Sequence, residues 1–149
     1  MAFIYTNPGV YLREISDDLA LPMGVVQYHL RVLGKNGELE EYRSGRYRRF
    51  FGANRYPENE RRVLALLRQG TSGRILVALT RESLAHAKLA SALGVSSQAL
   101  SWHMKRLREM GIVLVEMSSQ GERRYVLADG YGEEVKAYAF SKRNAMPIN

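Results

Sequence analysis

The sequence predicts a mainly helical fold with small β-hairpins (α+β), built from two similar units in tandem. One observation is a repeat: Leu19–Gly37 recurs at Leu93–Gly111, with leucine, histidine, leucine and glycine at matching positions and a constant offset of 74 (93 − 19 and 111 − 37). A second is that each copy ends in a Gly-centred, arginine-rich segment, Tyr42–Phe51 and Ser118–Val126. A repeat of this size indicates that one small unit was built twice.

The first unit is expected to span residues 1–56. Apolar residues at helical spacing predict a short helix over 12–19, after the turn signal of Asn7-Pro8-Gly9. A second helix is predicted over 22–35, because Asn36-Gly37 is a typical helix end. Tyrosine and phenylalanine on either side of Ser44-Gly45 then predict two strands within residues 39–51.

A linker helix is expected over residues 57–70, where a polar start is followed by a leucine-rich stretch and Gly70. The second unit, 71–130, begins with a further helix capped near Ser72. In the first unit only residues 1–6 hold the corresponding position, so either that helix is very short or the chain begins inside a longer protein.

The rest of the second unit repeats the first. A helix is predicted over 85–93, a longer one over 96–110 capped by Ser96, and paired strands over 112–117 and 123–127. The remaining residues, 131–149, are expected to form a C-terminal helix, around Glu133–Phe140, and a tail.

Composition narrows the class of partner. The net charge of +7 and the isoelectric point near 9.9 favour a polyanion. The distribution of the charges is more informative than the net charge, because residues 43–55 hold five arginines and no acidic residue. The absence of cysteine excludes disulfides and thiolate metal sites, no stretch approaches the roughly 18 apolar residues of a membrane span, and residues 1–9 lack a secretory signal. We expect a cytoplasmic protein.

The longer helix of each pair exposes a face suited to the major groove, where base edges present a distinguishable pattern of donors and acceptors. Such reading needs short polar side chains early on the helix and cations farther along it. The outward positions of the second unit, which meet this need well, are Ser97, Gln98, Ser101, Trp102, Lys105 and Arg108. Those in the first unit are Gln27, Tyr28, Arg31 and Lys35, after a less polar start at Met23-Gly24.

The hairpin after each of these helices is rich in arginine, which grips phosphate with paired donors and fits a narrow minor groove. We call the two hairpins wings. Their predicted contacts to DNA are Arg43, Arg46, Arg48 and Arg49 in the first and Arg123 and Arg124 in the second.

The segments NPGVYLREIS, VQYHLRVL, RSGRYRRFF and SSQALSWHMKRLREMGIV resemble tandem winged helix-turn-helix transcriptional regulators of archaeal type, which are similar to the ArsR and MarR families. The resemblance covers nearly the whole chain. It implies a cytoplasmic, often dimeric DNA-binding regulator whose contacts include Gln27, Tyr28 and Arg31, their counterparts Ser101, Trp102 and Lys105, and the wing arginines. There are two departures: Pro22 stands where Ser96 caps the second recognition helix, and the metal-sensing cysteines of ArsR proteins are absent.

Other interpretations of the same residues are less specific. His29 and His103 have no ligands at metal spacing, which favours packed or phosphate-facing side chains over a metal pair. Tyr28 and Trp102 suit either stacking on nucleic acid or packing at an interface. Adjacent acids on a helix point apart, and no catalytic motif is present, so we expect neither an enzyme nor a cofactor.

The sequence therefore predicts a regulator that binds double-stranded DNA, as a homodimer because paired reading heads match the symmetry of operators. Candidate dimer surfaces are Glu60–Gln69 and the tail helix with Tyr131, Val135, Tyr138 and Phe140. The alternative is a winged-helix module for protein–protein interaction, which the apolar start at Met23 favours for the first unit. No residue set distinguishes a pocket for a small-molecule effector from the core stripes.

Overall fold

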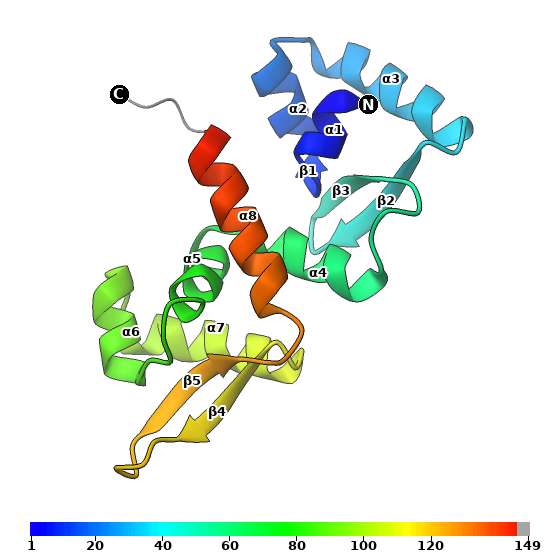
Figure 1. Ribbon diagram of the computed structural model, residues 1–149. Coiled ribbons are helices and arrows are strands. Elements are labelled where there is room, and N and C mark those ends of the chain that lie inside the picture. The colour runs from blue at the N-terminus through cyan, green and yellow to red at the C-terminus, as the bar shows by residue number, and fades with distance from the viewer. Residues whose placement is uncertain (146–149) are drawn as a thin grey trace. The chain divides into compact units, whose positions relative to one another are not determined.

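The computed structural model describes the backbone of residues 1–145 and the side chains of residues 1–139. It divides the chain into two compact units, Met1–Arg68 and Gln69–Asn149 (Figure 1). Each unit contains a helix pair followed by a β-hairpin, in the order that the repeat predicts.

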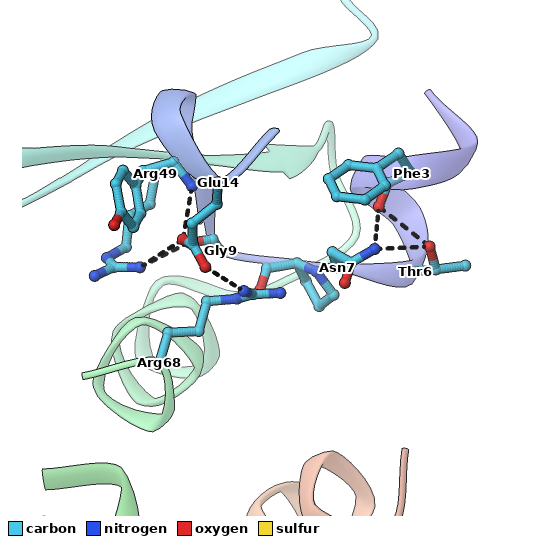
Figure 2. Close-up of polar contacts among 9 residues, drawn as sticks. Phe3, Thr6, Asn7, Gly9, Glu14, Arg49 and Arg68 are labelled. Atoms are coloured by element: carbon cyan, nitrogen blue, oxygen red, sulfur yellow. Dashed lines mark hydrogen bonds and ion pairs between the residues drawn. The ribbon is translucent and has the colours of Figure 1, made fainter. Parts of the chain in front are cut away.

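The first unit comprises four helices and three strands in the order α1 (Ala2–Thr6), β1 (Val10–Tyr11), α2 (Leu12–Leu19), α3 (Met23–Lys35), β2 (Leu39–Ser44), β3 (Tyr47–Gly52) and α4 (Glu58–Leu67). The first helix is indeed very short. It ends where the Thr6 hydroxyl (3.1 Å) and the Asn7 side-chain amide (2.9 Å) both donate to the Phe3 carbonyl, as Figure 2 shows.

A three-stranded antiparallel sheet in the order β1-β3-β2 forms the first wing and its base. The hairpin runs in register from Leu39 opposite Gly52 to Ser44 opposite Tyr47. On the other side of β3, Val10 pairs with Phe50 and Tyr11 with Arg49. The sequence pattern did not predict β1, and its pairing makes β3 the central strand rather than an edge.

The core of the first unit joins α1, β1, α2, α3 and β3. It contains Ile4, Val10, Ile15, Val26, Leu30 and Phe50. Val26 and Leu30 are four residues apart on α3 and so face the same way. This fixes the rotation of the helix and turns its other faces to solvent.

The second unit comprises α5 (Gly70–Leu79), α6 (His86–Leu93), α7 (Ser97–Glu109), β4 (Val113–Met117), β5 (Arg123–Leu127) and α8 (Gly132–Ala145). Strands β4 and β5 pair from Val113 opposite Leu127 to Met117 opposite Arg123. A single bridge between Leu84 and Tyr125 takes the place that β1 has in the first unit.

Three expectations for the second unit need correction. Helix α5 begins at Gly70 after Gln69, so Ser72 lies buried inside it and is not its cap. Helix α8 extends beyond the predicted residues 133–140. Val135 is fully buried and α8 packs on α5, so this residue belongs to the core of its own unit and not to a dimer surface. The side chain of Phe140 lies outside the described residues.

The repeat is visible in the backbone as well as in the sequence. Ala20 and Gly94 both end the first helix of a pair in the left-handed region, with φ of 52° and 67°. The beginnings of the second helices differ. The Ser96 hydroxyl accepts from the Ala99 amide at 3.0 Å, whereas Pro22 offers no side-chain acceptor to α3. Ser96 is thus confirmed as a cap.

Candidate nucleic-acid interface

Helices α3 and α7 present the predicted recognition residues to solvent. Gln27, Tyr28 and Arg31 are exposed on α3, and Ser97, Gln98, Ser101, Trp102 and Lys105 are exposed on α7. The opposite face of α7 is buried through Leu100, Met104 and Leu107. Amphipathic spacing therefore sets which side of each helix is free for a partner.

In the first unit, a groove of about 670 Å³ separates α3 from the wing. Gln27 and Arg31 line it from the helix, and Arg46 and Arg48 line it from the hairpin. Four residues predicted from two separate motifs are therefore brought together. Tyr28 and Arg43 are exposed but do not line this groove.

In the second unit, two adjoining grooves lie between α7 and the wing. One, of about 790 Å³, is lined by Ser101, Lys105 and Arg108, among others. The other, of about 410 Å³, adds Ser97 and the two wing arginines, Arg123 and Arg124. Arg108, another outward position predicted on the recognition helix, borders both grooves. Gln98 and Trp102 line neither.

Two wing arginines already have acidic neighbours. Arg48 lies 3.7 Å from Glu41, with most of its side chain exposed. Arg124 lies 3.2 Å from Glu122 and is about a third exposed. The exposed pair of Arg48 is weak, so this guanidinium can exchange partners, whereas the pair of Arg124 is partly buried.

Arg49 is the site prediction that the structure contradicts, because its side chain is buried at 2% exposure. Its Nη1 donates to the Gly9 carbonyl at 3.0 Å and lies 3.9 Å from a Glu14 oxygen (Figure 2). Burial lowers its pKa, and Glu14 opposes that shift. The pairing of β1 onto β3 covers this position, so Arg49 stabilises the base of the wing and does not reach a ligand.

Glu14 is the centre of this buried network. Its second carboxylate oxygen accepts from Arg68 Nη1 at 3.1 Å, and Arg68 Nε donates to the Pro8 carbonyl at 2.8 Å. The Tyr11 amide donates to Glu14 at 3.2 Å. One carboxylate therefore holds the start of α2, strand β3 and the end of α4 together (Figure 2).

The two repeat-related histidines have different surroundings. His103 Nδ1 lies 3.3 Å from the buried Ser72 hydroxyl, and its pKa is lowered by burial and then by Arg106. His29 is exposed and borders an apolar cavity of about 270 Å³ between α1, α2 and α3. Trp102, which precedes His103 in the sequence, is 58% exposed, and the Arg106 guanidinium lies 4.8 Å from its ring centroid.

The described part of the chain contains no helix that is long and apolar enough to cross a membrane. Among the same residues, no group of three or more His, Asp and Glu side chains is placed to hold a metal ion.

Known proteins match this chain in sequence over both units. Residues 1–64 match a family model described as an N-terminal HTH domain, and residues 58–113 match one described as winged helix-turn-helix DNA-binding. An uncharacterized HTH-type transcriptional regulator of Methanocaldococcus jannaschii is 28% identical over 113 residues, which are 74% of this chain and 28% of that protein. The chain thus spans less than a third of that relative's length.

Solved structures give partial matches. The homodimeric winged helix-turn-helix domain Mb0332 of Mycobacterium bovis, a possible ArsR-family regulator, is 22% identical with a TM-score of 0.47 and covers 59% of this chain and 79% of its own. The Staphylococcus aureus MepR–DNA complex is 15% identical with a TM-score of 0.47, and the match covers 58% of this chain and 75% of that one.

The two matches together show an N-terminal helix-turn-helix domain followed by a winged helix-turn-helix domain, and the chain is similar in sequence to an HTH-type transcriptional regulator.

Proposed function

We propose that this protein regulates transcription by binding double-stranded DNA through the groove face of each unit. The observation that carries the proposal is that helix and wing residues line the same grooves, Gln27 and Arg31 with Arg46 and Arg48, and Ser97 and Ser101 with Arg123. An α-helix fits the major groove, and the hairpin beside it reaches the adjacent backbone or minor groove.

The two units are proposed to make different kinds of contact with DNA. Helix α7 begins with Ser97 and Gln98, whose polar groups suit base edges. Helix α3 begins with Met23 and Gly24, which offer no side-chain hydrogen bonds, while its wing holds three exposed arginines. The second unit is therefore proposed to supply most of the sequence preference and the first most of the backbone contacts. We further propose that the protein acts as a homodimer in the cytoplasm.

Replacing Arg43, Arg46 and Arg48 together by alanine tests the proposal. Each arginine that neutralises a phosphate releases counterions, so the variant should bind duplex more weakly. Its log–log salt slope should fall by roughly 0.9 for each phosphate that is no longer neutralised, about 2 to 3 in all. Arg81→Ala is the matched control, because Arg81 is exposed and lines none of the grooves described above. Fluorescence anisotropy at several salt concentrations measures both quantities. An unchanged slope in the triple variant would count against the proposal.

A second function is favoured for the first unit by its apolar surface. Met23 and Val25 are 39% and 40% exposed, and the apolar cavity beside α3 is open to Leu19 and Val32. Exposed apolar groups that adjoin one another are typical of protein contacts. Under this alternative the first unit holds a protein partner. Loss of partner binding in Leu19→Ser with unchanged DNA affinity would support it.

A further inference from the structure

His86, the first residue of α6, is hydrogen-bonded to two other elements of the second unit. Its Nδ1 lies 2.9 Å from the Tyr125 hydroxyl on β5. Its Nε2 lies 3.1 Å from the Ser97 carbonyl and 3.0 Å from the Ser97 hydroxyl, at the first residue of α7. One imidazole ring therefore connects the wing with the start of the recognition helix.

The Ser97 carbonyl fixes the direction of these bonds. A carbonyl oxygen only accepts, so the Nε2 that faces it must carry hydrogen. In the neutral ring Nδ1 is then the acceptor, and the Tyr125 hydroxyl donates to it. Protonation of the ring would reverse only the bond to Tyr125, and Nε2 would remain a donor towards Ser97.

Two hydroxyl groups on α7 acquire opposite roles from this arrangement. Because Nε2–H faces the Ser97 hydroxyl oxygen, that oxygen accepts and its own hydrogen is free to be donated elsewhere. Ser101, one turn later, donates its hydrogen to the Ser97 carbonyl at 2.9 Å, which leaves its oxygen as an acceptor. Both side chains are exposed and line the groove that also holds Arg108 and Arg123.

We propose that His86 is a positioning residue that sets the hydrogen-bond polarity with which α7 reads DNA. Ser97 donates to an acceptor on a base edge, such as guanine N7 or O6 or thymine O4. Ser101 accepts from an exocyclic amino group of adenine or cytosine. The inference rests on the proposed function, since it concerns how the second unit discriminates among duplexes.

The first unit supplies a natural reference for this device. Position 86 corresponds to Leu12, which packs partly buried against the core, and Ser97 corresponds to Met23. The repeat therefore accommodates leucine where His86 stands, without any of its hydrogen bonds. His86→Leu accordingly removes the polar connection and keeps an apolar side chain that this fold already tolerates.

The experiment selects bound sequences from a randomised duplex library with the full chain, and then measures affinity for the selected duplex and its single-base variants. His86→Leu and Ser97→Ala should each lower the preference at the same base pair by roughly threefold to tenfold, the equivalent of one hydrogen bond. Ser101→Ala should lower it at a different base pair. The double variant His86→Leu/Ser97→Ala should lose no more than either single one. His86→Gln, whose amide donor stands near the place of Nε2, should restore the preference.

The possible outcomes distinguish a failure of the role proposed for His86 from a failure of the proposed DNA-binding function. If the wild-type chain enriches no duplex, the proposed function fails and the inference with it. If it does, but His86→Leu keeps the full preference or weakens every duplex equally, only the inference is overturned. If circular dichroism shows that His86→Leu does not fold, Ser97→Ala and Ser101→Ala test the inference instead. Each identifies the base pair that its serine contacts. The assigned polarity is contradicted if Ser97 proves to contact an amino group of a base, or Ser101 a keto group.

Discussion

Glu14→Gln should destabilise the first unit far more than its place near the surface indicates. The side chains of Arg49 and Arg68 are 3% and 5% exposed, and the Glu14 carboxylate lies 3.9 Å and 3.1 Å from them. Glutamine keeps the acceptor for the Tyr11 amide but removes the charge, so two buried guanidinium groups would lose this carboxylate.

Breaking a buried ion pair costs about 3 to 5 kcal/mol. Glu14 itself is 28% exposed and glutamine retains hydrogen bonds, so we expect a loss of about 2 to 3 kcal/mol. With an m-value near 1 kcal/mol/M for a domain of this size, the midpoint of urea unfolding should fall by roughly 2 M. Circular dichroism follows the transition, and hydrogen exchange assigns it to the first unit.

Glu41→Gln is the matched control, since it removes the same charge from the exposed pair with Arg48 at 3.7 Å. Exposed pairs contribute about 0 to 1 kcal/mol, so this variant should unfold almost like the wild type. If the two glutamine variants lost equal stability, the reasoning about the buried network would be wrong.

Three further predictions concern other residues of the chain. Arg49→Ala should lower the midpoint of urea unfolding of the first unit. It should leave the salt slope of DNA binding unchanged when binding is measured under conditions in which the variant is folded. The fold lowers the pKa of His103 below its ordinary value of 6.5, so this residue takes up a proton more readily in the unfolded chain. The free energy of unfolding should therefore fall as the pH drops below about 6.5. In thermal unfolding measured at several pH values, His103→Asn should reduce this loss. Gly9→Ala should cost about 1 to 2 kcal/mol in urea titrations, because φ is +86° there and the new methyl group meets Phe51 and Arg68.

Much of the fold could be predicted because the core stripes are periodic. The helix predicted over 22–35 differs from α3 by one residue at its start, and the helix predicted over 96–110 differs from α7 by one residue at each end. Leucine and valine at helical spacing and the Ser96 cap mark both helices clearly. The start of α5 was harder to place, because Gly70 is a poor helix former that tertiary packing nevertheless includes in the helix.

The parts of the site that were missed depend on interactions between distant residues. Arg49 resembles its exposed neighbours in RSGRYRRFF, and only the two-residue strand β1, too short to show a pattern, buries it. His86 is not marked by the sequence pattern, because its partners Ser97 and Tyr125 are 11 and 39 positions away in the sequence. Hydrogen-bond partners of this kind leave no local periodicity that a sequence pattern could reveal.

The divergence between the repeats has a consequence for orientation. Where one copy has Leu12 and Met23, the other has His86 and Ser97, so the two halves of a single polypeptide are not interchangeable. A pair of identical heads reads a palindrome the same way from either end. Each asymmetric chain of the proposed homodimer would instead give its half-site a polarity, so that inverted and direct arrangements of the same half-site would not be equivalent.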